Sequence, residues 1–509
     1  MHYIIQMFKK KFKAIISFKY EIIIIFCLLC CYFYTFFSPF IWDDLVMVRD
    51  NPYLKQLDFF ELFFRSAFGE PFSPSKFYRP IQLVSFWFDY NVFGLNAVGF
   101  RVMSFFYGSL LGIIVFHCFK KLHFQSFISC CLTLLFLLHP LQIEAITYIS
   151  GRGDLLYMVF CLGAFLLFLK PKFSYRRASL IFLLIIAAFL TKENSVVFPV
   201  ILFGYAWLFL KKRQQYFSMG LVLIALSYSA IRLFLPASDG VLSWIAAASF
   251  FERICTVPYI LVTYLKLSFF PFPLHMEYHN VISTFFSVHF FVLLVLLLLL
   301  AVPVLFVVQK KLYVFAIGWF FCCLIPVLQV VVGLASTVRE HWASLALFGL
   351  VLGLGLGVQQ IPKRFYYHRG VVLVCMIVLL AGVTIHRNQF WLSEQTLYEN
   401  DLRYEPRSFV MLNNLGRLYY EQGQIDLAKM YFLKAVYRSP NHVYDVALNN
   451  VGAVYLSQGN QALAELYFKQ SIRYGQYLLA YQNLLSLYKQ QGRLAEYNDL
   501  KQTYQQLQK

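Results

Sequence analysis

Long apolar runs constrain this 509-residue chain more than any other feature of its sequence. The run from Phe286 to Val308 alone is long enough to cross the hydrocarbon core of a bilayer as a helix. The chain is 60% hydrophobic and 14% charged, whereas soluble domains are roughly half apolar and a quarter charged. Because a backbone inside a bilayer must satisfy its own hydrogen bonds, we expect an all-α, polytopic membrane bundle.

Basic residues between the apolar runs predict how the chain is oriented. If loops such as Lys120-Lys121, Lys211 to Arg213 and Lys310-Lys311 are all cytoplasmic, the runs must cross the membrane in pairs. This rule predicts about eleven spans, with the N-terminus inside and the C-terminus outside. The expected spans are residues 22–39, 100–118, 125–139, 155–170, 178–192, 196–210, 217–235, 286–308, 313–332, 343–359 and 370–386.

Three other features are explained by the membrane pattern. The net charge of +19 comes from Lys and Arg in short loops, so we expect no nucleic-acid partner. Cysteine pairs such as Cys130-Cys131 lie in apolar spans and have no metal-ligand spacing, which predicts packing residues. The basic start, Lys9 to Lys13, resembles a signal peptide but no small-residue cleavage site follows, so we expect an uncleaved first span.

The expected outer face begins with Asp43 and Asp44, at the exit of the first span. A carboxylate there costs several kcal/mol to desolvate unless it is paired or faces a water-filled cavity. Two adjacent carboxylates therefore indicate a site. An equally good interpretation is that both carboxylates face water at the membrane surface. They open a large outer loop, residues 43–99, in which 58–64 and 83–93 are expected to be interfacial helices. Residues 254–273 contain three prolines and are expected to be interfacial or re-entrant.

Further polar groups fall on the same expected face. Arg and Lys beside a membrane-level cavity suit a phosphate group, and a neighbouring Asp or Glu could act as general base toward a hydroxyl. Singly, each group also fits a self-neutralising ion pair or a snorkelling cap; together they favour one site. The candidate residues are Tyr78, Arg79, His139, Glu144, Arg152, Asp154, Lys192, Glu193 and Arg339.

The C-terminal segment changes to polar sequence rich in Tyr, Gln and Leu, and it repeats. Asn414, Asn450 and Asn483 open similar units spaced 36 and then 33 residues apart. Each unit continues with a glycine, at Gly423, Gly459 or Gly492, and then an alanine. This is the tetratricopeptide pattern, in which stacked helix pairs form a curved surface for a protein partner. We therefore expect two domains, residues 1–392 in the membrane and residues 393–509 on the outer face.

The ordered set of motifs resembles a known family. The set resembles the transmembrane and tetratricopeptide-repeat O-mannosyltransferases of the GT-C superfamily. The members of the set are Asp43-Asp44, Tyr78-Arg79-Pro80, the segment from His139 to Asp154, Lys192-Glu193, the segment from Tyr264 to Leu274 and the tetratricopeptide tail. The resemblance covers nearly the whole chain. It implies a GT-C fold and inverting transfer of a mannose-like hexose from a polyprenyl-phosphate donor to a hydroxyl, such as that of protein Ser or Thr.

The resemblance also implies roles for the candidate residues. Either Asp43 or Asp44 would be the catalytic base, with Arg79, Arg152, Lys192 and Arg339 holding the donor phosphate. Tyr78, His139, Glu144, Asp154 and Glu193 would support them. One motif departs from the family pattern. Where the family has a run like Arg-Tyr-Leu-Tyr, this chain has Arg339 followed by Glu340-His341-Trp342, so the resemblance there is limited to Arg339.

The expected partners are the membrane lipid donor and a protein or peptide acceptor bound by the repeats. No paired Cys/His signature is present, so a divalent metal is not indicated. We expect a bacterial inner membrane, with the repeats periplasmic, or alternatively the endoplasmic reticulum. The alternative function is a non-enzymatic membrane scaffold whose repeats assemble an envelope complex. A transporter is disfavoured because the hydrophobic spans show no internal repeat.

Overall fold

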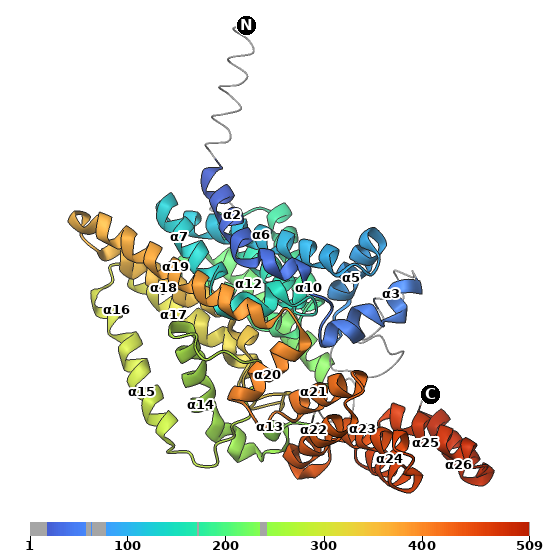
Figure 1. The fold of residues 1–509 in the computed structure, drawn as a ribbon. Helices are drawn as coiled ribbons and strands as arrows, with labels where there is room; N and C mark the ends of the chain where they lie inside the picture. Colours follow the sequence, from blue (N-terminus) through green and yellow to red (C-terminus); the bar gives the residue numbers. More distant parts are fainter. Residues whose placement is uncertain (1–17, 57–62, 64–77, 171–172, 235–241, 508–509) are drawn as a thin grey trace.

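The computed structural model describes residues 18–56, 63, 78–170, 173–234 and 242–507. Over these ranges the chain is helical, and its β-structure consists of one isolated bridge between Tyr278 and Val338. Figure 1 shows the N-terminal helices in the upper part of the molecule and the C-terminal helices at its lower right. The all-α prediction is confirmed.

Five helices of the described part are long and apolar enough to cross a membrane. A sixth is added if α7 (Ser126–Leu137) and the following short helices over Pro140–Thr147, bent by 61° to it, form one span. The five are α2 (Lys19–Tyr32) continued to Phe37, α6 (Ala97–Lys121), α15 (Val288–Ala301) continued through α16 (Pro303–Phe306), α17 (Lys310–Leu324) continued to Val327, and α19 (Tyr366–Phe390).

Each of the eleven expected spans contains a helix within the described ranges, although the remaining ones are short or carry polar ends. Helices of 12–17 residues reach only part of the way across a bilayer about 30 Å thick. These helices are α7, α9 (Arg152–Phe168), α10 (Tyr175–Phe189), α11 (Phe198–Phe209) and α18 (Leu347–Gln360). The longer α12 (Lys212–Phe234) begins with a basic, polar turn.

Close helix contacts hold the N-terminal bundle together. α6 packs against α2, α7 and α9. Gly112 of α6 makes this approach possible, because a Cβ there would lie 2.7 Å from Leu137 and 2.9 Å from Ile24. The absence of a side chain at one position therefore brings three helices to a common contact.

The segment expected to be interfacial or re-entrant contains a regular helix. α14 (Phe250–Phe269) begins with a capping box between Ser249 and Glu252 and retains Pro258 inside it. It ends before Pro271, and the chain then runs without regular structure through Leu274 to Asn280. Of the two helices expected in the outer loop, the second is α5 (Pro80–Phe93), whereas the first lies outside the described residues except for Phe63.

The C-terminal helices confirm the repeat prediction. After α20 (Glu394–Tyr404), three antiparallel pairs follow in the described chain. They are α21 (Phe409–Glu421) with α22 (Ile425–Arg438), α23 (Asp445–Ser457) with α24 (Gln461–Gly475), and α25 (Leu478–Gln490) with α26 (Leu494–Leu507). Gly423, Gly459 and Gly492 end the first helix of each pair with φ between 70° and 80°, a conformation that glycine adopts without strain.

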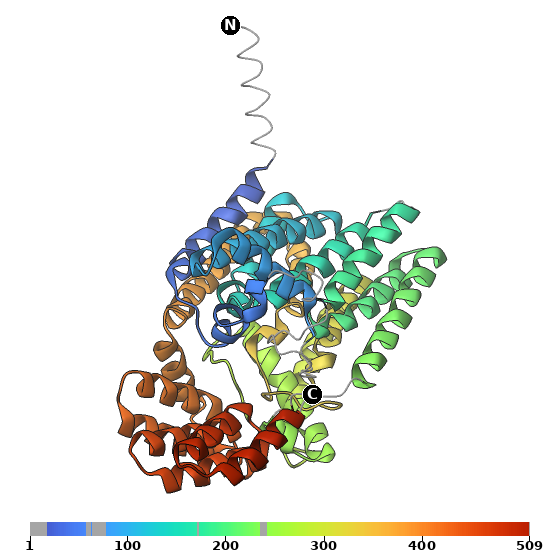
Figure 2. The same ribbon diagram turned by 90° about the vertical axis from the view of Figure 1, so that its right-hand side faces the viewer.

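The repeats are joined to the rest of the chain through the segment after α14. Figure 2 shows the repeat helices at one end of the molecule, reached from α19 through α20. The Met276 amide donates to Asp401 Oδ2 over 2.7 Å, and the His279 amide donates to Glu405 Oε2 over 3.1 Å. The side chain of Ser393 caps the N-terminus of α20.

Candidate functional site

The two adjacent carboxylates at residues 43 and 44 have different surroundings. Asp44 is fully buried. Its Oδ1 accepts hydrogen bonds from the amide and the hydroxyl of Ser150, over 2.8 and 2.7 Å, and its Oδ2 accepts from the Ile41 amide. Burial raises the pKa of Asp44 to about 6, although Arg101 and the Ser150 hydrogen bonds oppose the shift. Asp44 therefore joins the segment that follows the first expected span to the segment before α9 by hydrogen bonds.

Asp43 is partly accessible and lies among cations. Trp42 adopts the left-handed conformation, with φ 53°, and stacks on Tyr148 with the ring centroids 5.8 Å apart. The Asp43 amide donates to the Tyr148 hydroxyl over 3.2 Å. Burial raises the pKa of Asp43, and the positive charges of Arg339 and Arg79 oppose that rise. The left-handed backbone conformation at Trp42 thus places the two neighbouring aspartates in different environments.

Arg339 connects Asp43 to a carboxylate that the sequence analysis missed. Its Nη2 lies 2.6 Å from Glu277 Oε1, and its guanidinium lies 5.3 Å from the centre of the Trp42 ring. Glu277 also accepts a hydrogen bond from Ser408, in the turn before α21, over 2.8 Å. Burial raises the pKa of Glu277, but hydrogen bonding from His279 and the charge of Arg339 outweigh it and lower the pKa to about 2.

A second polar group surrounds Asp154, near the start of α9. Lys192 Nζ donates to both Asp154 oxygens over 2.6 Å. His341 Nε2 lies 3.9 Å from Asp154 Oδ2, while its Nδ1 is hydrogen-bonded to Glu144. Four residues from three distant parts of the sequence therefore form one chain of contacts. The Asp154 and Asp43 charges both act on Arg79, which brings the two groups into the same electrostatic field.

Arg79 and Tyr78 lie at the start of α5. Arg79 Nε donates to Glu193 Oε2 over 3.0 Å, so this guanidinium bridges the start of α5 and the segment before α11. The Tyr78 hydroxyl donates to the Phe63 carbonyl over 2.6 Å, a contact between residues 15 positions apart in the sequence.

Two candidates are not brought into this arrangement. Arg152 is fully buried and pairs with Asp89, and it also donates to the Ser104 hydroxyl and the Phe100 carbonyl. Its contacts are those of a structural ion pair between α5, α6 and α9. His139 caps the turn before Glu144 by accepting from the Leu141 amide, and its other ring nitrogen contacts the Ser268 carbonyl.

The residues missed were Glu277, Tyr148 and His341. His341 lies two positions after Arg339 in the sequence, and its acidic partner Glu144 was a candidate. Glu277 lies between two histidines, His275 and His279, shortly after the prolines that follow α14. This cluster of polar residues was the feature of the sequence that could have identified Glu277. Nothing local distinguishes Tyr148, because its role depends on stacking with a residue 106 positions earlier.

A cavity of about 600 Å³ adjoins this arrangement, between residues 39–49 on one side and α20 and α21 on the other. Glu394 and Arg417 line it and form an ion pair over 2.8 Å. Glu394 Oε1 also accepts a hydrogen bond from the Trp42 amide over 3.1 Å. The repeat domain therefore contacts the residue that precedes Asp43.

Comparisons with known proteins show what the chain is similar to. The model of the tetratricopeptide repeat family matches residues 407–476. Protein O-mannosyl-transferase F38B6.6 of Caenorhabditis elegans is 23% identical over 422 residues, which cover 80% of this chain and 60% of that protein. Protein O-mannosyl-transferase TMTC3 of Homo sapiens is 23% identical over 480 residues, covering 84% of this chain and 52% of that protein.

The mouse TMTC3 protein gives the same picture, with 24% identity over 480 residues. The chain thus spans between 52% and 60% of the length of these relatives. The similarity confirms the resemblance that the motifs and the repeats predicted.

Proposed function

We propose that the chain is a membrane glycosyltransferase that moves a mannose-like hexose from a polyprenyl phosphate to a protein Ser or Thr hydroxyl, with inversion. The observation that carries the proposal is the position of Asp43. It is the partly accessible member of the carboxylate pair, and Arg339 and Arg79 lie close enough to act on it. The similarity to protein O-mannosyl-transferases supports the same reaction class.

In the proposed reaction Asp43 removes the proton of the acceptor hydroxyl. The hydroxyl oxygen attacks the anomeric carbon, and the bond from that carbon to the phosphate oxygen breaks. The polyprenyl phosphate leaves with the bonding electrons, and the inverted sugar is joined to the acceptor. An Asp whose pKa is raised is a stronger base once it is ionised, which favours this role.

Arg339, Arg79 and Lys192 are the cations we propose for the donor phosphate. Arg339 Nε is buried and has no hydrogen-bond partner among the described residues, so it keeps a donor for a ligand. Lys192 uses two of its three N–H groups on Asp154. These charges stabilise the leaving phosphate as it becomes more negative. We leave Arg152 out of this set because it is committed to Asp89.

The membrane arrangement that accompanies this proposal has eleven spans, a cytoplasmic N-terminus and the repeats on the opposite face. The bacterial inner membrane stays our proposal, and the animal origin of the relatives supports the endoplasmic reticulum as the alternative. Labelling of Lys211→Cys and Gln458→Cys variants with an impermeant thiol reagent tests the orientation. The two positions should label from opposite sides; labelling from one side contradicts it.

Transfer from polyprenyl-phosphate mannose to a Ser/Thr peptide, using the purified full chain, tests the reaction. Asp43→Asn should lower the rate by about 10²–10⁴-fold, the usual contribution of a general base. Asp50→Asn is the matched control, because Asp50 is exposed in the same loop and pairs only with Arg49 among the described residues. Full activity of Asp43→Asn removes the base assignment. The alternative is a non-enzymatic membrane scaffold. It is supported if the wild type transfers no sugar and deletion of residues 394–509 abolishes function.

A further inference from the structure

A cavity of about 520 Å³ lies at the far end of the N-terminal helices from Asp43. It is formed where α2 begins, α6 ends and α7 begins, so it adjoins the ends of two membrane-crossing helices. Figure 1 shows the first turn of α2 at the end of the molecule opposite the repeat helices. The volume is within the range of small-molecule sites, about 300–1,000 Å³.

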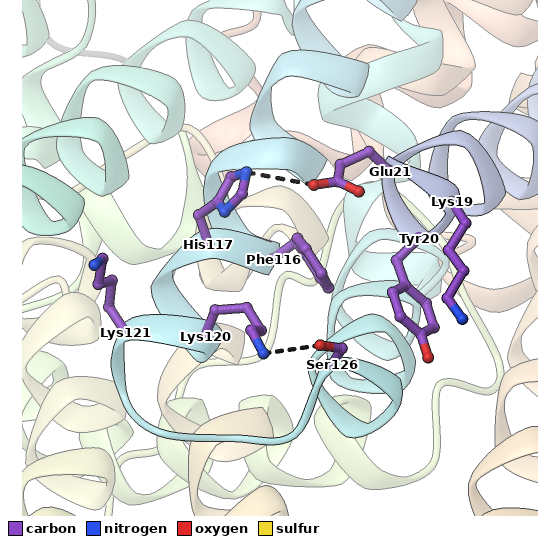
Figure 3. Close-up of a pocket in the computed structure, with 8 residues that line it drawn as sticks. All are labelled: Lys19, Tyr20, Glu21, Phe116, His117, Lys120, Lys121 and Ser126. Carbon is purple, nitrogen blue, oxygen red and sulfur yellow. Dashed lines mark hydrogen bonds and ion pairs between the residues drawn. The ribbon is translucent and has the colours of Figure 1, made fainter. Parts of the chain in front are cut away.

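The cavity presents charges of both signs. Lys19, Lys120 and Lys121 provide three ammonium groups, and Lys120 Nζ donates to the Ser126 hydroxyl over 2.8 Å. Figure 3 shows this Lys120–Ser126 pair on one side of the Phe116 ring and Glu21, paired with His117, on the other. Lysine and hydroxyl groups together suit a phosphate.

Glu21 is the unusual member of this group. It is only 8% exposed, and its Oε2 has no hydrogen-bond partner among the described residues. His117 Nε2 lies 3.5 Å from the other oxygen. An unpaired buried carboxylate oxygen is costly, and an ammonium group that donates to it removes the cost.

The surface beside the cavity is apolar. Ile22, Ile23 and Phe26 on α2 are 50%, 43% and 63% exposed, and Phe127, next to Ser126, is 45% exposed. Side chains of this kind on a membrane-crossing helix contact acyl chains. A ligand that is charged at the cavity and apolar beside it is a membrane lipid.

We propose that this cavity binds the headgroup of an aminophospholipid, in which a phosphodiester is joined to a primary ammonium, as in phosphatidylethanolamine. Lys120, Lys19 and Ser126 bind the phosphate, and Glu21 accepts a hydrogen bond from the ammonium. Phosphatidylglycerol offers the phosphate without a cation for Glu21. Phosphatidylcholine offers a quaternary ammonium without an N–H to donate. Basic pockets between membrane helices are known to bind lipid headgroups, and Glu21 gives this one its selectivity.

Native mass spectrometry of the purified full chain, titrated with each of the three lipids, tests the proposal. The wild type should bind phosphatidylethanolamine about tenfold more tightly than the other two, the effect of one charge-assisted hydrogen bond. Glu21→Gln should abolish this preference. Lys120→Gln and Lys19→Gln should weaken phosphatidylethanolamine and phosphatidylglycerol alike. Lys19 is exposed, so its replacement leaves packing intact.

The matched control is Lys311→Gln, which removes one charge from an exposed lysine outside the cavity. Equal binding by Lys311→Gln, Lys120→Gln and Lys19→Gln overturns the site, and an unchanged preference in Glu21→Gln overturns the role of the carboxylate. Glycerophosphoethanolamine, which has the headgroup without acyl chains, should bind far more weakly; saturation at the lipid's concentration would show a soluble ligand instead. Asp43→Asn should bind the lipid normally, which separates this proposal from the transfer reaction.

Discussion

The hydroxyl and the backbone amide of Ser150 both donate to the same oxygen of Asp44, over 2.7 and 2.8 Å. This double contact joins the exit of the first span to the start of α9, across 106 positions of the sequence. It leaves Asp44 fully buried, while Asp43 beside it stays partly accessible. The pair thus divides into one residue that holds the loop and one that the proposed chemistry uses.

Ser150→Ala should therefore destabilise the protein without changing the proposed reaction. It removes one hydrogen bond to a buried carboxylate, which is worth about 1.5–3 kcal/mol. The apparent Tm of the purified chain should fall, while transfer per folded molecule is retained. Ser227→Ala is the control, because Ser227 is exposed on α12. Equal Tm values for the two variants contradict the holding role of Asp44.

Glu394→Gln should slow transfer through its contact with Trp42. Glu394 accepts hydrogen bonds from the Trp42 amide, the Tyr398 hydroxyl and Arg417. Loss of its charge weakens the Arg417 pair and loosens the turn that orients Asp43, so kcat should fall about tenfold with the donor KM unchanged. Glu399→Gln, exposed on the same helix, should have no effect. A change confined to KM argues against positioning of Asp43.

Asp401 should make stability depend on pH. Burial raises its pKa to about 7, although Arg387 opposes the shift. A carboxyl whose pKa is higher in the folded state stabilises the protein at low pH, and this contribution is lost as pH rises from about 4 to about 7. The Tm difference between the wild type and Asp401→Asn should therefore change across that window and level off above it. A constant difference from pH 4 to 8 rules out this titration.

Gly452→Ala should disrupt the second repeat. A Cβ at Gly452 would lie 2.7 Å from the Phe468 ring, so α23 and α24 would have to separate, at a cost of about 1–3 kcal/mol. Hydrogen exchange in these helices should increase. Gly357→Ala on α18 meets nothing within 4 Å and should be neutral or slightly stabilising. Adding Phe468→Leu should restore protection in Gly452→Ala; failure of this rescue contradicts the steric explanation.

The helices and the repeats could be predicted from sequence because their causes are local. A helix bonds residues four apart, so an apolar run such as Phe286 to Val308 determines its own secondary structure in a membrane. The turns at Gly423, Gly459 and Gly492 need positive φ, which glycine supplies at regular spacing. Most of the candidate polar residues were found because charges are rare in such a chain.

The partners of those charges depend on contacts between distant segments, which local periodicity does not encode. Arg79 pairs with Glu193, 114 positions away, whereas Arg152 looks similar in sequence but is buried against Asp89. The sequence does not distinguish the roles of the neighbouring Asp43 and Asp44. The left-handed conformation at Trp42 and the hydrogen bonds from Ser150 to Asp44 distinguish them in the structure. From the sequence alone we could predict a helical bundle with C-terminal repeats and name most of the carboxylates and cations of the candidate site. Only the tertiary structure decided which carboxylate is held in a structural contact, because that depends on the packing of helices far apart in the chain.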